Sequence, residues 1–178
     1  GALVSDTSIV RQGDFLSVTI PDQKPKKEKG IDLPLDILYE DDCLLVIDKA
    51  AGLACIPGPD HWEVNLKCAL MRYLPDPYIG MVHRLDLPTS GVILIAKDKK
   101  AAADLSKQIA ERSCHRIYRA IAEGITEEEG RIDAPIGRDP FNFRRFAVTE
   151  KDSKKALTCY RRIEKSGSYS EAEFFILL

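Results

Sequence analysis

Runs of apolar residues separated by polar turns divide this chain into short strands and two helices. Apolar positions recur every three or four residues over 63–74, which predicts an amphipathic helix that ends at Pro75. Asp98 is a favourable N-cap for a second helix over 99–112. Strand-like runs are expected at 37–39, 43–47, 92–96, 117–122, 131–136, 155–163 and 169–178. Short strands with few helices predict an α+β fold with a mixed, mainly antiparallel sheet.

The first thirty residues have a different pattern from the rest. Residues 10–20 contain a Gly-Asp turn and a strand-like run, which is too short for a domain, so we expect residues 1–20 to be the remnant of one. Residues 21–30 are polar, rich in lysine and without an apolar period, which predicts a mobile linker. The main domain is therefore expected to cover residues 31–178.

The composition is that of an ordinary globular protein, with 44% hydrophobic and 30% charged residues. No apolar run approaches the roughly 20 residues that a membrane helix needs, and no signal peptide is visible at the start. Five cysteines are scattered without a CxxC pair, which argues against disulfides or a zinc site and favours the reducing cytoplasm. We expect a cytoplasmic monomer that does not bind membranes.

The formal net charge of −2 hides an uneven distribution, because residues 81–162 hold 17 Lys and Arg against 12 Asp and Glu. A basic excess is typical of a surface that binds a polyanion such as RNA, although a solvated surface of mixed charge explains it equally well. Within residues 138–154, aromatic and basic residues interleave: Phe141, Phe143 and Phe146 with Arg138, Arg144 and Arg145. They could clamp a polynucleotide by stacking, or the phenylalanines could anchor a long loop to the core.

Residues 81–91, MVHRLDLPTSG, form a polar cluster between two apolar runs. Pro88 and Gly91 favour a turn, which would present Arg84 and Asp86 on a loop held between rigid elements. A carboxylate there can act as a nucleophile toward an electrophilic carbon. An arginine beside it could fill the space left by a base turned out of its stack. The two residues could equally be a structural ion pair, so both interpretations stay open.

Other kinds of chemistry have no motif in this chain. The three histidines, His61, His83 and His115, are far apart and none belongs to an HExxH pattern. The glycine-rich patterns GxxxxGK[ST] and GxGxxG are absent, and so is a GxSxG nucleophile turn. We therefore expect neither a metal nor a cofactor.

The segment HRLDLPTSG, residues 83–91, resembles the HRLDxxTSG motif of the RluA-like pseudouridine synthases. Further segments resemble that family in the same order along the chain: LYEDD, VIDK and GL within 38–53, RIYRA and a glycine within 116–124, GRIDAPIGR at 130–138 and KALT at 155–158. The resemblance covers residues 31–178. Residues 1–20 resemble the end of the small RNA-binding domain that often precedes this catalytic domain.

This resemblance implies the pseudouridine synthase fold and a reaction that isomerises uridine in a stem-loop of rRNA or tRNA, without metal or cofactor. It implies Asp86 as the nucleophile and Arg84 as the residue that everts the uridine and takes its place. Tyr118 would stack on the base and help to move the proton at its C5. Taken alone, Tyr118 would be a half-buried sheet tyrosine with a bonded hydroxyl. His83, Thr89 and Arg116 are expected at the substrate site, where His83, Thr89 and Ser90 shape the loop.

Departures from the family pattern leave alternatives open. Ala50 stands where the family usually has Pro, and Arg116 stands where it usually has Lys; both are tolerable changes. The chain also stops before a further motif whose arginine pairs with the catalytic Asp, so we expect a chain truncated at both ends, with little or no turnover as given. One alternative is a non-catalytic RNA-binding module of the same fold. Another is a metal-dependent nuclease built on the acidic stretch 36–48.

Overall fold

The computed structural model describes residues 9, 11–15, 17, 28–76, 78–142 and 145–177. Its elements in chain order are β1 (Asp36–Glu40), β2 (Leu44–Lys49), α1 (Leu66–Tyr73), β3 (Gly80–Met81), β4 (Gly91–Ala96), α2 (Lys99–Glu111), β5 (Ile117–Glu123), β6 (Glu129–Asp133), β7 (Ile136–Arg138), β8 (Phe146–Val148), β9 (Leu157–Ser166) and β10 (Tyr169–Ile176). The N-terminal turn is present, since the Asp14 N–H donates to the Arg11 carbonyl at 3.1 Å. Most of the strand and linker expected after it lies outside the described residues.

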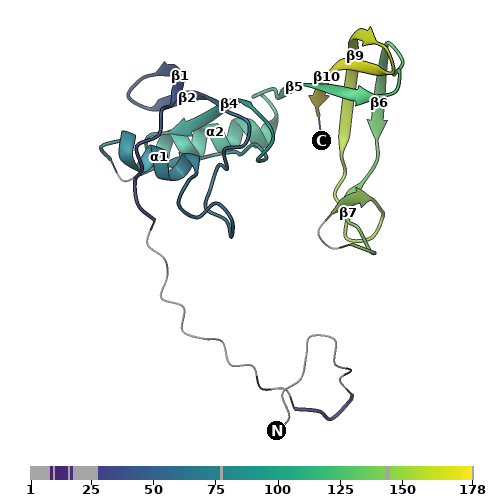
Figure 1. Cartoon of the computed structure of the whole chain (residues 1–178), viewed down its shortest axis with the longest axis horizontal. Coiled ribbons are helices and arrows are strands. Elements are labelled where there is room, and N and C mark those ends of the chain that lie inside the picture. Colours follow the sequence, from purple (N-terminus) through teal and green to yellow (C-terminus); the bar gives the residue numbers. More distant parts are fainter. Residues whose placement is uncertain are drawn as a thin grey trace.

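The first sheet has the strand order β1-β2-β4-β3, and all its pairs are antiparallel. Side chains alternate along its central strands, so Leu45 and Ile47 of β2 lie opposite Ile95 and Ile93 of β4 and are fully buried. Burying a side chain of this size stabilises the fold by about 1.5–3 kcal/mol. The core of the protein therefore lies on one face of this sheet (Figure 1).

Helix α1 covers that face with Leu66 and Leu70, which belong to the same buried cluster. The helix starts at Leu66 and not at residue 63, because Asn65 caps it: its side-chain oxygen accepts the Cys68 N–H at 3.0 Å. The Asn65 amide group also donates to the carbonyls of His61 and Trp62, at 3.0 and 3.1 Å. The side chain of the fully buried Asn65 thus uses both its oxygen and its nitrogen in hydrogen bonds. These bonds join the preceding loop to the helix.

Replacing Asn65 with Ala is expected to lower the free energy of unfolding by about 1–2 kcal/mol, because the helix loses its cap. Urea unfolding followed by circular dichroism measures this loss. Asn65→Ser keeps an oxygen that accepts the Cys68 N–H but loses the two donors, so its stability should lie between wild type and Asn65→Ala. Equal stability of wild type and Asn65→Ala would contradict the role of the cap.

Helix α2 begins as expected at Asp98, whose carboxylate accepts the N–H groups of Lys100 and Ala101 at 2.7 and 2.8 Å. The helix contacts β3 and β4. It approaches closely because Gly80 has no side chain: a Cβ there would lie 2.9 Å from the Ala96 Cβ and 3.1 Å from the Ala102 Cβ. Neither helix is long and apolar enough to cross a membrane, which holds for the described part of the chain.

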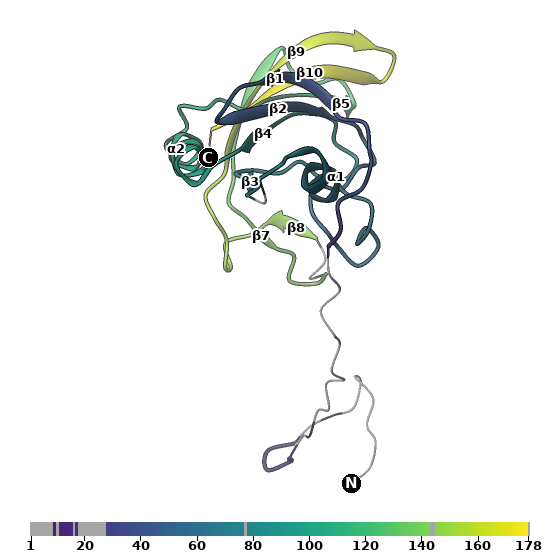
Figure 2. The same cartoon turned by 90° about the vertical axis from the view of Figure 1, so that its left-hand side faces the viewer.

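The second sheet has the order β5-β10-β9-β6 and is antiparallel throughout. Figure 1 shows it beside the first sheet, with β5 leading from α2 into it. The strand expected at 131–136 is instead two strands, because β6 ends before Pro135 and β7 pairs with β8. The β7–β8 hairpin lies beyond the end of the second sheet that is opposite to the tip of β9–β10 (Figures 1 and 2). The α+β class is confirmed, with antiparallel pairing of all the described strands.

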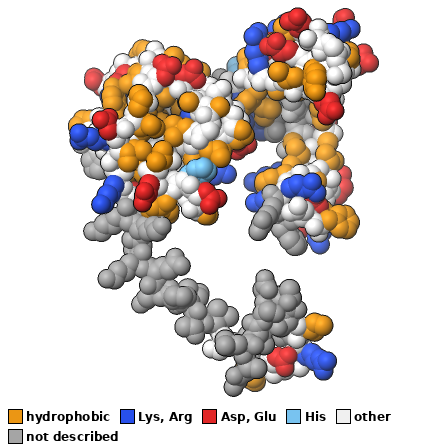
Figure 3. Space-filling view, viewed as in Figure 1, with side chains coloured by type: hydrophobic (Ala, Val, Ile, Leu, Met, Phe, Trp, Pro, Cys, Tyr) orange, Lys and Arg blue, Asp and Glu red, His pale blue; other side chains and the backbone are white. Residues whose placement is uncertain are grey.

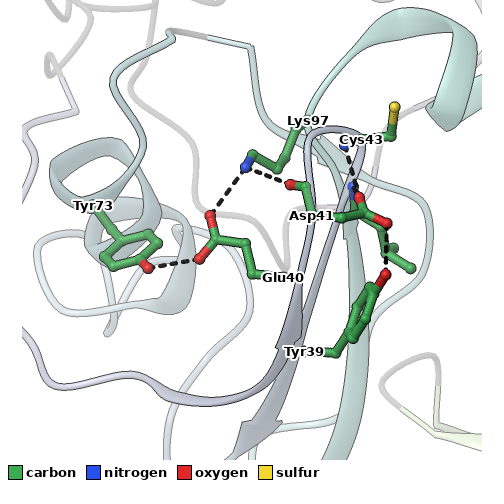
Figure 4. A network of polar contacts seen from close by, with 7 residues as sticks. Tyr39, Glu40, Asp41, Cys43, Tyr73 and Lys97 are labelled. Carbon is green, nitrogen blue, oxygen red and sulfur yellow. Dashed lines mark hydrogen bonds and ion pairs between the residues drawn. The ribbon is translucent and has the colours of Figure 1, made fainter.

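A network of polar side chains fixes the acidic turn between β1 and β2 (Figure 4). Glu40 accepts hydrogen bonds from Tyr73 of α1, at 2.7 Å, and from Lys97, at 3.0 Å. These bonds hold the pKa of Glu40 below its ordinary value. Asp41 accepts the N–H of Cys43 at 2.8 Å, and backbone bonds of this kind lower its pKa. Glu40 and Asp41 thus hold this turn in place, and the described residues contain no group of three or more ligands placed to hold a metal ion.

Candidate active site

The polar cluster of the sequence lies on the loop 82–90, between β3 and β4. Leu85 points into the core and is 8% exposed, whereas its neighbours Arg84 and Asp86 are exposed. The Thr89 N–H donates to the Asp86 carbonyl at 3.1 Å and closes a turn. No ion pair joins Arg84 to Asp86, both of which the structure describes, so the ion-pair interpretation of these two residues was wrong. Both side chains are available to a bound molecule.

A second segment, residues 50–55, holds this loop in place by hydrogen bonds. The Gly52 N–H donates to the Leu87 carbonyl at 2.8 Å, and the Cys55 thiol lies 3.2 Å from the Leu85 carbonyl oxygen. Gly52 has a φ of +82°, a left-handed conformation that favours glycine. The sequence analysis did not connect this segment to the polar cluster.

One ring nitrogen of His83 makes a hydrogen bond to the backbone of the first sheet. Its Nε2 accepts the N–H of Leu94 in β4 at 2.9 Å, so this nitrogen carries no proton in the folded state. Burial lowers the pKa of His83, and the positive charge of nearby Arg116 lowers it further. Both effects keep the imidazole neutral and therefore preserve the bond to β4.

We expect the free energy of unfolding to fall as the pH drops below about 6.5, the ordinary pKa of histidine. The folded pKa of His83 is lower than that of the unfolded chain, so the unfolded chain binds more protons in this window. The loss should level off below the folded pKa. Urea unfolding at pH 7.5 and at lower pH measures it, with His83→Gln as the comparison. If His83→Gln shows the same pH dependence as wild type, the effect belongs to other groups.

A cavity of about 510 Å³ lies beside the loop, between β4, the end of α2 and the start of β5. Its volume is in the range of small-ligand sites. Apolar side chains from these elements line part of it: Leu85, Val92, Leu94, Ile109 and Ile117. Four of the predicted site residues line it as well: His83, Thr89, Arg116 and Tyr118. Arg84 and Asp86 belong to the same loop but not to the lining. Cys114 and His115, which the sequence analysis did not select, also contribute.

Tyr118 lies on β5, opposite Phe174 of β10, and is half-buried against the core cluster. Its ring lines the cavity. Within the described residues its hydroxyl makes no hydrogen bond, which contradicts the interpretation of Tyr118 as a sheet tyrosine with a bonded hydroxyl. A free phenol at the wall of a cavity can stack on a planar ligand and donate or accept a proton.

The β7–β8 hairpin presents aromatic and basic side chains to solvent. Phe141 is 97% exposed and Phe146 63% exposed, so neither anchors this segment to the core. The guanidinium of Arg138 lies over the ring of Phe146, 4.2 Å from its centroid. In the space-filling view, basic and hydrophobic side chains lie next to each other on this part of the surface (Figure 3). Phe143 and Arg144, which also belong to the predicted cluster, lie outside the described residues.

Comparison with known proteins gives one consistent result. Residues 43–177 match the family described as RNA pseudouridylate synthase. Ribosomal large subunit pseudouridine synthase D of Nitrosomonas europaea is 44% identical over 137 residues, which is 75% of this chain and 40% of that protein. The corresponding protein of Pseudomonas aeruginosa is 38% identical over 169 residues, which is 93% of this chain and 52% of the relative.

A protein of Synechocystis described as an uncharacterized RNA pseudouridine synthase is 36% identical over 176 residues, covering 93% of this chain and 54% of that one. The chain thus spans about half the length of the curated relatives it matches. Among solved structures, human RNA pseudouridylate synthase domain containing 1 is similar with a TM-score of 0.69 and 23% identity, over 88% of this chain and 63% of that one. At this identity the likeness establishes the fold.

Proposed function

Since the chain belongs to the RNA pseudouridylate synthase family, we propose that the complete protein isomerises uridine to pseudouridine in RNA. The bond between N1 of the base and C1′ of the ribose breaks, the base turns, and C5 joins C1′. The proton leaves C5 and N1 gains one, so the reaction needs no oxidant or reductant. The observation that carries the proposal is the cavity lined by His83, Thr89, Arg116 and Tyr118, next to a loop that bears an unpaired Asp86.

We propose roles for four of the predicted residues in this reaction. Asp86 acts as the nucleophile that assists cleavage of the bond between base and ribose, and it is released when C5 joins C1′; its exposed carboxylate supports this role. Arg84, exposed beside it, enters the space that the everted uridine leaves in the RNA. Tyr118 stacks on the base and helps to move the proton from C5, its hydroxyl giving up one proton as it takes the other. Arg116 draws the phosphates of the nucleotide toward the cavity.

For the rest of the chain, we propose that residues 31–178 act as the catalytic domain and that residues 21–30 connect it to the segment 1–20. The β7–β8 hairpin contacts RNA, a role that the exposed Phe141 and the stacked Arg138 and Phe146 support. The substrate is a uridine in a stem-loop, in ribosomal RNA or in transfer RNA. Ribosomal RNA is favoured by the names of the relatives. The protein acts as a monomer in the cytoplasm, where its free cysteines stay reduced.

The test is tritium release from RNA transcripts labelled at C5 of uridine, because C5 loses its hydrogen when the new bond forms. The complete protein that carries this chain is incubated with ribosomal RNA fragments and, separately, with transfer RNA. Release from one class identifies the substrate. If the protein binds RNA without releasing tritium, it is the non-catalytic RNA-binding module. RNA cleavage that EDTA suppresses would identify a nuclease and overturn the proposal.

A further inference from the structure

The residues on both sides of Asp86 are held by one segment of the chain, residues 50–55. Before Asp86, the Cys55 thiol donates to the Leu85 carbonyl at 3.2 Å, and the Cys55 sulfur lies 3.4 Å from the Leu85 N–H, which it accepts. After Asp86, the Leu87 carbonyl accepts the Gly52 N–H at 2.8 Å. The Leu85 carbonyl belongs to the planar peptide that joins Leu85 to Asp86. By holding this carbonyl, the thiol fixes the orientation of that peptide and therefore the direction in which the Asp86 side chain points.

Cys55 is itself held against helix α1 by backbone hydrogen bonds. Its carbonyl accepts the Lys67 N–H at 3.1 Å, and the carbonyl of Ala54 accepts the Leu66 N–H at 2.8 Å. Both donors belong to the first turn of α1, which Asn65 caps from a fully buried position. A continuous set of bonds therefore runs from the core helix through Cys55 to the peptide before Asp86.

Lys49 stiffens the same segment from its other end. Its ammonium group donates to the carbonyls of Ala50 and Leu53, at 2.9 and 2.8 Å, and the residue is 1% exposed. Between these two carbonyls stands Gly52 in its left-handed conformation. The buried Lys49 side chain thus joins the two ends of the turn 50–53. The shape of this turn determines where the Gly52 N–H contacts the loop that carries Asp86.

We propose that Cys55 is a positioning residue, which holds the Asp86 carboxylate in its reactive direction through the backbone of Leu85. The inference rests on the proposed function, since it assigns the thiol a task in that reaction. A thiol suits this place because it is compact, tolerates full burial and can both donate and accept a weak hydrogen bond. An aliphatic side chain of similar size would fill the same space but would leave the N–H and C=O of Leu85 without their partners.

The alternative role of Cys55 is simple core packing, and a matched pair of variants separates the two roles. Cys55→Val fills the space of the thiol with an apolar side chain that has one heavy atom more, and it removes both hydrogen bonds. Cys68→Val is the control, because Cys68 is also buried, within α1, but among the described residues its thiol makes only one long contact, 3.9 Å from the Trp62 carbonyl oxygen. Cys55→Ser restores a donor and an acceptor and is the conservative rescue.

The experiment measures kcat and KM for tritium release by the complete protein, at a temperature where all variants are folded. We expect Cys55→Val to lower kcat by about 10-fold to 100-fold with little change in KM. Cys55→Ser should recover part of this loss, and Cys68→Val should keep a kcat within about twofold of wild type. A wild-type kcat in Cys55→Val, or an equal loss in Cys68→Val, would overturn the proposal.

A second measurement is independent of turnover. Hydrogen exchange of the Leu85 amide should become faster in Cys55→Val than in Cys68→Val, because only the first variant removes its acceptor. Unchanged exchange in Cys55→Val would overturn the positioning role even in an active enzyme. If the wild-type protein releases no tritium but the exchange changes as expected, the proposed function has failed and the thiol still orders the loop.

Discussion

Replacing Asp86 with Asn is expected to abolish pseudouridine formation while RNA binding remains. Asn has nearly the same shape as Asp, but its neutral amide cannot act as a nucleophile at neutral pH. Since Asp86 is exposed and makes no ion pair with any residue that the structure describes, its replacement should not disturb the loop. We expect a loss of kcat on the order of 10⁴-fold, which is typical when a central catalytic group is removed. Tritium release measures turnover, and electrophoretic mobility shift measures binding of the same RNA.

Asp104→Asn is the matched control, because Asp104 is also exposed but lies on α2, where its carboxylate accepts a hydrogen bond from the Gln108 side chain at 2.9 Å. Its turnover should equal that of wild type. Substantial tritium release by Asp86→Asn would show that another group starts the reaction. Loss of RNA binding in Asp86→Asn would show instead that the carboxylate serves to bind substrate, and its assignment as nucleophile would fall.

The sequence predicted correctly those elements that depend on residues close together in the chain. Asp98 caps α2 through N–H groups two and three residues further on, so residues 98–101 contain all that this helix start requires. The start of α1 was placed too early because the apolar period continues to Val64, which is exposed, whereas the cap is at Asn65. A capping residue was therefore a better signal than periodicity at this end.

Features that depend on distant partners were not predicted. The strand β8 spans only Phe146–Val148 and exists because it pairs with β7. In the candidate site, the motif of residues 83–91 selected Asp86 and Arg84 as candidates, since both lie in one short segment of the sequence. The support from Cys55 could not be predicted in the same way, because thirty residues separate it from Leu85 and a buried cysteine is usually a packing residue.

Tyr118 is the second residue on which we expect catalysis to depend, because the pairing of β5 with β10 places its side chain at the candidate site. This pairing holds the ring of Tyr118 opposite Phe174 and at the wall of the cavity. Tyr118→Phe keeps the ring that stacks on the base and removes only the hydroxyl. If that hydroxyl moves the proton from C5, kcat should fall by about 10²-fold to 10⁴-fold with KM nearly unchanged.

The comparison with Tyr118→Ala separates the two roles of this side chain. Removing the ring should also raise KM, because base–aromatic stacking contributes about 1–3 kcal/mol to binding. Tyr169→Phe is the control, since Tyr169 is 51% exposed at the far end of β10 and outside the cavity lining. A wild-type kcat in Tyr118→Phe would exclude the hydroxyl from proton transfer. The proton at C5 would then need another acceptor, and His115, which lines the same cavity, would be the next group to replace.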